Sequence, residues 1–349
     1  MKNLKTQGFV LIDVDVVALN NAGKNTQSNF DNAVATKKIY KNGRSYVYVS
    51  GQAWRYWWRE ALQKNAGWEL SPVIREAKIA FTSADPFKFA DDDVFGYMKA
   101  ASEKVTDDKG KGKSVNITVT RVSPLKNSAI ISAASVNPVE NWSSMARQEG
   151  DSVPYSKQEY SAIMKGMFSL DLVQVGTFSN YNKTGFVNLS EKLYKEAIEI
   201  DDPFVKSSDG KPAKLIRLDK ETRKKRILDT IQALKYISGG AMQTNNLGDV
   251  TPKFIILATT TTGNHPFSNI VKNTGKNDEI AQLNIEGLRE VLSDYKSTFE
   301  GKVFIGKRSG FFDEENKSLE ELKNLGFIEF TSVNDAIDKY CEQLKNQIE

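Results

Sequence analysis

The sequence is poor in the residues on which many catalytic and metal sites depend. Its 349 residues include one cysteine and one histidine. A lone cysteine excludes an intramolecular disulfide and is typical of proteins in a reducing cytoplasm. Cys341 shares a predicted helical stripe with Ile337 and Tyr340, so we interpret it as a small buried hydrophobe rather than a nucleophile.

The single histidine, His265, stands before a proline in a turn-like stretch. A zinc site built from His265, Cys341 and carboxylates would have none of the usual ligand spacing. A Ser-His-Asp triad stays open, although no nucleophile elbow accompanies the histidine. We interpret His265 as a loop residue, and we expect no metal and no cofactor.

Long apolar runs are also missing. No run approaches the roughly 20 residues of a membrane span, so we expect no membrane partner. Asp13 and Asp15 interrupt the apolar residues near the start, and no small-residue cleavage site follows, so we expect no signal peptide and a cytoplasmic protein. The net charge of +4 permits a polyanionic partner without requiring one.

The most informative stretch present is residues 46–62. It begins with the alternation of a strand and changes at Ser50, a good helix N-cap, to helical spacing. One predicted face carries an apolar stripe of Trp54, Trp57, Trp58, Ala61 and Leu62. The opposite face carries Gln52, Arg55, Tyr56 and Arg59. Two interpretations stay open, a solvated surface helix or a phosphate site at the helix N-terminus.

Other segments near the start predict strands. Residues 8–19 alternate, with Val10, Ile12, Val14 and Val16 on one face, and a polar loop follows over residues 20–32. Residues 37–40 and 44–49 flank an Asn-Gly pair and predict a basic hairpin. Residues 136–161 show neither helical nor strand periodicity, which predicts a long functional or disordered loop.

Two charged segments need interpretation. The acidic triplet Asp91–Asp93 is either a cation site or, as we prefer, the start of a helix. Residues 219–238 predict a helix that buries Ile227, Ile231 and Leu234. The basic residues in its first turns form a charge run that is usually a solvated face. They also indicate a nearby anion, because the helix dipole disfavours cations there. The glycine-rich turn that follows could cradle a phosphate.

The order of elements predicts an α+β fold. We expect helices at residues 279–297, 319–324 and 333–345, with a strand at 302–305. Upstream, the simplified order is strand, helix, strands, strand, helix, strand. This is the split βαβ arrangement of a ferredoxin-like or RNA-recognition domain, here with large insertions.

A series of motifs resembles one known family. The series resembles the Cas-seven family of CRISPR-associated RAMP proteins, in its DevR type from type I-B-like systems. The motifs are Asn20–Gly23, YVSGQAWRYWWRE at 48–60, DDDVFGYM at 91–98, TRVSPL at 120–125, QEYSAIMKGMFSLDLVQVGTF at 158–178, and GGAMQ before the strand at 253–258.

The resemblance implies a hand-shaped, non-catalytic protein with an RNA-recognition palm. It implies that residues 1–66 form the first half of the palm, that residues 67–135 form the fingers and further palm strands, and that residues 136–165 form a thumb. The palm would continue over 166–262, and a helical part would occupy 263–349. The thumb residues Trp142, Met145 and Tyr155 would wedge between bases or pack on protein.

The resemblance also implies contacts with guide phosphates. It assigns them to Ser50, Gln52, Arg55 and Arg59, and to Gly239, Gly240 and Gln243 in the glycine turn. We predict further RNA contacts at Asn21, Lys24, Lys37, Lys38, Arg44 and Arg121.

The implied function is sequence-independent binding of CRISPR guide RNA by the repeated backbone subunit of a type I surveillance (Cascade) complex. The guide would be positioned to pair with a target DNA strand. Partners would be further copies in a helical filament and other Cascade subunits. Two alternatives stay open: a RAMP-type endoribonuclease with His265 as general base, and a structural module that binds no RNA.

Overall fold

A mixed sheet of 12 strands organises the fold in our computed structural model, which describes residues 2–29, 31–76, 79–106, 112–145, 149–181, 187–195 and 197–348. The main path runs in the order β21 (Ile328–Thr331), β20 (Val303–Lys307), β17 (Phe254–Thr260), β1 (Lys5–Val17), β13 (Val153–Asp171), β11 (Ile130–Ser132), β5 (Arg44–Val49) and β4 (Lys38–Lys41). Off this path lie β10 (Leu125–Asn127), β12 (Val139–Met145), β2 (Asn21–Lys24) and β3 (Ala33–Thr36). The prediction of an α+β fold is confirmed.

The sheet is buried on both faces because its central strands are apolar on both sides. Along β1, Val10 and Ile12 enter one core, and Phe9 and Leu11 enter the other. The first core is covered by α1 (Gly51–Ala66), α4 (Lys220–Gln232) and α8 (Val333–Lys345). The second is covered by α6 (Ile285–Asp294), α7 (Asn316–Glu321) and the hairpin of β18 (Val271–Thr274) and β19 (Ile280–Leu283).

The prediction that Val16 shares the buried face of β1 is wrong. The register of β1 with β13 shifts between Val14 and Val17. At this bulge Val16 takes a left-handed backbone, with φ of +47°, and 54% of its surface is exposed. Val17 is buried in its place, because an extra residue in a strand reverses the side-chain alternation beyond it.

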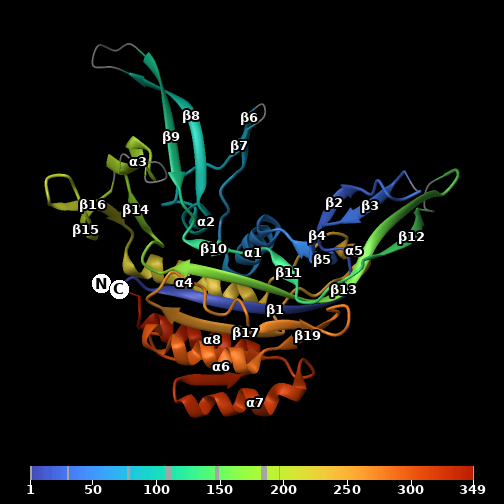
Figure 1. The fold of residues 1–349 in the computed structure, drawn as a ribbon. Coiled ribbons are helices and arrows are strands. Elements are labelled where there is room, and N and C mark those ends of the chain that lie inside the picture. Colours follow the sequence, from blue (N-terminus) through green and yellow to red (C-terminus); the bar gives the residue numbers. More distant parts are fainter. Residues whose placement is uncertain are drawn as a thin grey trace.

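Several hairpins project from the sheet on either side of α1 (Figure 1). On one side rise β6–β7 (Ile74–Glu76, Ile79–Phe81) and β8–β9 (Tyr97–Thr106, Gly112–Arg121), near the short helix α2 (Ala90–Phe95). On the other side extend β2–β3 and the far end of β12–β13. A small sheet of β14 (Thr177–Ser179), β16 (Pro212–Arg217) and β15 (Glu199–Lys206) lies near α3 (Glu191–Lys195).

The interpretation of residues 136–161 as an irregular loop is wrong. Strands β12 and β13 pair there as an antiparallel hairpin, from Val139 opposite Glu159 to Met145 opposite Val153. Most described side chains of β12 are exposed, so the segment needs no apolar alternation, and its pairing comes from backbone hydrogen bonds. Residue 165, the predicted limit of the thumb, falls within β13.

The predicted C-terminal helices are correct in part. Helix α8 matches its prediction, but residues 280–283 form strand β19, and α6 begins only at Ile285. Strands β18 and β21 were not predicted, and β2 lies inside the predicted polar loop. These strands are four residues long, and partner strands rather than local patterns specify them. Among the described residues, no helix is long and apolar enough to cross a membrane.

Candidate nucleic-acid interface

Helix α1 is anchored as its sequence predicts. The Ser50 hydroxyl accepts a hydrogen bond of 3.3 Å from the Ala53 amide and caps the helix. The predicted stripe of Trp54, Trp57, Trp58, Ala61 and Leu62 is entirely buried. Trp58 also donates from its indole to the Thr230 carbonyl at 2.8 Å, which attaches α1 to α4.

The outer face of α1 borders an open cavity of about 890 Å³. The second wall comes from the end of α2, the start of β8, the end of β9, and β10. The lining residues are Gly51, Gln52, Arg55 and Arg59 on α1, facing Phe95, Gly96, Tyr97, Arg121, Val122, Ser123, Leu125, Lys126, Asn127 and Ala129. A groove of this kind, bordered by a helix N-terminus and cations, suits a chain of phosphates.

Arg55 joins the two walls of this cavity. Its guanidinium donates to the Leu125 carbonyl at 2.7 Å, to Asn127 Oδ1 at 3.1 Å and to Ser123 Oγ at 3.0 Å, and also to the Phe95 carbonyl. Burial, and then the nearby charge of Arg59, lower its pKa to about 10. Arg55 therefore does not present a free guanidinium, because its terminal N–H groups hold protein acceptors.

Three other side chains of the cavity keep their polar groups available. Gln52 and Lys126 are exposed, and Arg59 is half-buried with its guanidinium 5.7 Å from the centre of the Phe95 ring. In the part of the chain that the structure describes, none of the three makes a side-chain hydrogen bond or a close ion pair. Lys126 was missed from the sequence; its position two residues after the Ser-Pro turn of the TRVSPL motif is the signal that could have found it.

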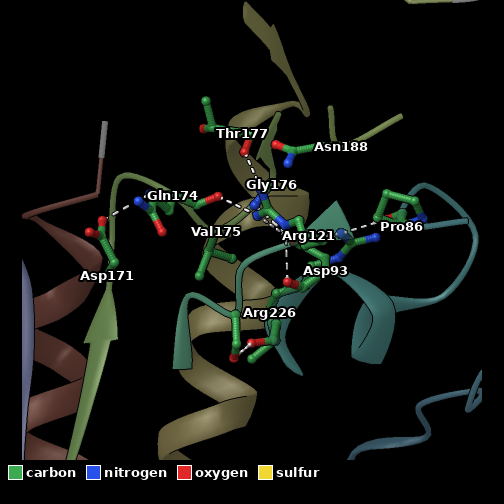
Figure 2. A network of polar contacts seen from close by, with 12 residues as sticks. Pro86, Asp93, Arg121, Asp171, Gln174, Val175, Gly176, Thr177, Asn188 and Arg226 are labelled. Atoms are coloured by element: carbon green, nitrogen blue, oxygen red, sulfur yellow. Dashed lines mark hydrogen bonds and ion pairs between the residues drawn. The ribbon is translucent and has the colours of Figure 1, made fainter. Parts of the chain in front are cut away.

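Arg121, a predicted RNA contact, belongs to a buried ionic network (Figure 2). Its side chain is 4% exposed and pairs with Asp93, whose side chain is fully buried. Asp93 also accepts from Arg226 at 2.7 Å and from the Gly176 amide at 2.8 Å. Asp93 is therefore the anion that the basic helix α4 indicated, and it comes from the protein itself.

The acidic triplet is the first turn of α2, as preferred from the sequence. Asp91 accepts from the Ser71 amide at 2.9 Å, and Asp92 accepts from the Asp85 amide at 3.0 Å. Burial raises the pKa of both carboxyls. Within the described residues no group of three His, Cys, Asp or Glu side chains could hold a metal ion.

His265 lies in a loop, as predicted, and its Nε2 is 2.9 Å from the Gly8 carbonyl oxygen. Burial lowers its pKa. Gly8 belongs to β1, so His265 lies against the central sheet and does not line the cavity beside α1.

The glycine turn packs beside α1. A Cβ atom on Gly239 would lie 2.2 Å from the Trp57 ring, and Gly240 takes a φ of +111° that favours glycine. The side-chain nitrogen Nε2 of Gln243 donates to the Gly239 carbonyl and, at 3.2 Å, to the Gly248 carbonyl. The nitrogen of Gln243 therefore braces the turn, and none of the three predicted residues lines the cavity of α1.

The basic hairpin faces a different cavity, of about 640 Å³, which Lys38 and Arg44 line. Arg44 donates to the Lys276 carbonyl at 3.0 Å and pairs with Asp278 at 3.3 Å. Lys37 is half-buried next to this hairpin. The structure thus separates these predicted residues from the group on α1.

The remaining predicted residues lie on the projecting hairpins. Asn21 is exposed on β2, and Lys24 makes an exposed ion pair of 3.2 Å. Trp142 is 61% exposed on β12, and Tyr155 is half-buried on β13. Met145 ends β12, and its side chain lies outside the described part of the structure.

Comparison with known proteins identifies a family and similar solved structures. Residues 10–282 match the family model described as CRISPR-associated negative auto-regulator DevR/Csa2. A chain of a CRISPR RNA-guided surveillance complex aligns with a TM-score of 0.50 and 8% identity, covering 97% of this chain and 99% of that one. A chain of such a complex before nicking aligns with a TM-score of 0.51 and 9% identity over the same shares. No curated protein matches the chain. At these identities the structural likeness shows the fold alone.

Proposed function

Because the chain belongs to the DevR/Csa2 family of CRISPR-associated proteins, we propose that it binds CRISPR guide RNA without reading its bases. In this proposal it is the repeated, non-catalytic backbone subunit of a type I surveillance complex of the Cascade kind. The guide held by successive copies then pairs with a target DNA strand.

The cavity beside α1 is the observation that carries the proposal. Gln52, Arg59 and Lys126 offer an amide and two cations along its length, and the first-turn amides of α1 add the positive end of a helix dipole. Such groups bind phosphate oxygens and leave base edges unread. A spacer of arbitrary sequence requires this kind of contact.

The topology supports the proposal. The central strands follow the order β17, β1, β13, β11, with antiparallel neighbours, and the chain inserts α1 after β1 and α4 after β13. This order supports the split βαβ palm that we propose for the protein. Both faces of the sheet are covered, and we propose the groove beside α1 as the place for a strand of RNA.

The size of the groove supports the partners that we propose. One cavity holds a short stretch of backbone, so a long guide needs further copies in a filament, together with other Cascade subunits. We propose a cytoplasmic assembly of the type I-B kind. In the same proposal the protein cuts no RNA, and a guide incubated with it stays intact with or without added metal.

Salt-dependent RNA binding tests the proposal. The variant Arg59→Ala/Lys126→Ala removes two cations from the cavity. For single strands the plot of log K against log salt has a slope of about −0.7 per neutralised phosphate, so the slope should become shallower by about 1.4. The loss of affinity should be the same for unrelated RNA sequences.

The matched control is Arg289→Ala/Lys317→Ala. Arg289 and Lys317 lie on α6 and α7, which cover the opposite face of the sheet. This variant loses the same net charge and should keep the slope of the unmodified protein. An unchanged slope in the cavity variant, measured on folded protein, would refute the proposed site.

A further inference from the structure

Two large apolar residues combine a strained backbone with high exposure. Val16 has a φ of +47° and is 54% exposed, and Leu247 has a φ of +44° and is 86% exposed. A left-handed backbone is unfavourable for residues with a branched side chain. An exposed apolar side chain also contributes no hydrophobic stabilisation that would offset this cost. Strain of this sort persists where the surroundings impose it, and it gathers at functional sites.

The two residues are neighbours. The side-chain amide of Asn246 donates to the Val16 carbonyl at 2.6 Å. On the other side of Leu247, a Cβ on Gly248 would lie 2.7 Å from Val17. Leu247 is therefore held over the end of β1, and we refer to Val16 and Leu247 together as the apolar knob.

Side chains from another strand hold the knob in place. The Val16 amide donates to Ser161 Oγ at 3.1 Å, and Asn246 also bonds to Glu159. Both Ser161 and Glu159 belong to β13. The strained backbone of Val16 thus has a partner for its N–H and for its carbonyl, so the conformation is built into the structure.

The knob lies near the end of the cavity of α1. Asn20, four residues after Val16, accepts a hydrogen bond of 2.9 Å from the amide of Ser50, the N-cap of α1. Four residues of extended chain span at most about 14 Å. A strand that leaves the cavity beside Gly51 and Gln52 can therefore reach the knob within a few nucleotides.

We propose that the apolar knob packs against the face of a nucleobase of the single strand bound beside α1. This proposal rests on the proposed function. The four nucleobases all have an apolar face, and aliphatic side chains make no hydrogen bond to a base edge. The knob therefore adds affinity without adding sequence preference, in keeping with a protein that accepts any guide.

Substitution of Leu247 tests whether its strained backbone and exposed side chain serve RNA binding or only the fold. Leu247→Asn accepts the left-handed backbone and removes the apolar side chain. The folding equilibrium constant should rise about fivefold or more, because the strain is relieved. Affinity for a single-stranded RNA of about 12 nucleotides should fall about threefold to tenfold, equally for unrelated sequences, as measured by fluorescence anisotropy. Leu247→Met keeps the apolar contact and should bind as the unmodified protein does.

Ile198→Asn is the matched control, because Ile198 is 84% exposed and lies just before β15, away from the cavity. It should leave RNA affinity unchanged. Normal RNA affinity in Leu247→Asn would overturn the knob. If Leu247→Asn kept normal RNA affinity but lost the association between copies seen by sedimentation without RNA, the proposal would also be overturned. The knob would then be a contact between protein copies. If Arg59→Ala/Lys126→Ala also binds normally, the proposed function fails with it; if that variant binds weakly, only the knob fails.

Discussion

Replacement of Asp93 by asparagine tests the internal network beside the proposed RNA groove. The side chain of Asp93 is fully buried, and it is the carboxylate that pairs with both Arg121 and Arg226. Asparagine keeps the shape of the side chain but leaves two buried guanidinium groups without a counter-charge. Breaking a buried pair in this way costs about 3–5 kcal/mol.

The expected thermal shift follows from the length of the chain. Unfolding entropy of about 2.1 cal/mol/K per residue gives roughly 0.7 kcal/mol/K for 349 residues. The loss of 3–5 kcal/mol should therefore lower Tm by about 4–7 °C, measured by scanning calorimetry. Urea unfolding should give the same free-energy difference.

The control is Asp201→Asn, which breaks the exposed ion pair with Lys214. That change should cost about 1 kcal/mol or less. If Asp93→Asn were no more destabilising than Asp201→Asn, the burial of the network would not determine its strength, and the reasoning would be wrong. A triple variant with apolar side chains at Asp93, Arg121 and Arg226 should recover much of the lost stability.

Three further predictions concern single positions. Arg55→Lys cannot reproduce the fork of hydrogen bonds and should cost about 1–3 kcal/mol in urea unfolding, whereas Arg59→Lys should change stability by less than about 0.5 kcal/mol. Gly239→Ala should cost about 1–3 kcal/mol, because its Cβ would lie 2.2 Å from Trp57; a Cβ on Gly263 meets nothing within 4 Å, so Gly263→Ala should be neutral. Burial lowers the pKa of His265 below its ordinary 6.5, so the unfolded chain binds the proton more readily. Stability should then fall as pH drops below about 6.5, and His265→Gln should show a smaller loss in urea unfolding between about pH 7.5 and 5.5.

Helix α1 shows what local sequence patterns can predict. The cap at Ser50 and the buried stripe from Trp54 to Leu62 are confirmed residue by residue. Helical periodicity and capping depend on neighbours within a few positions, so one sequence contains the information they need. The hairpin around Asn42-Gly43 is confirmed for the same reason, because both turn residues adopt the positive φ that such turns require.

Local sequence patterns do not predict which distant segments pair with each other. Nothing near Val16 in the sequence signals its bulge, because the shift depends on the register with β13. Residues 139–145 lack an apolar alternation, so their pairing into a hairpin could not be predicted from their own pattern. Short strands such as β18 and β19 depend on each other in the same way.

The sequence by itself determined which side of α1 is buried and that the other side carries arginines. Only the tertiary structure decided which of those charges remain available. Arg55 and Arg121 find acceptors at positions tens of residues away, whereas Arg59 and Lys126 line the cavity with no such acceptor among the described residues. The physical reason is that a guanidinium binds whichever acceptors the folded chain brings within about 3 Å, and that proximity is a property of the fold rather than of any local stretch.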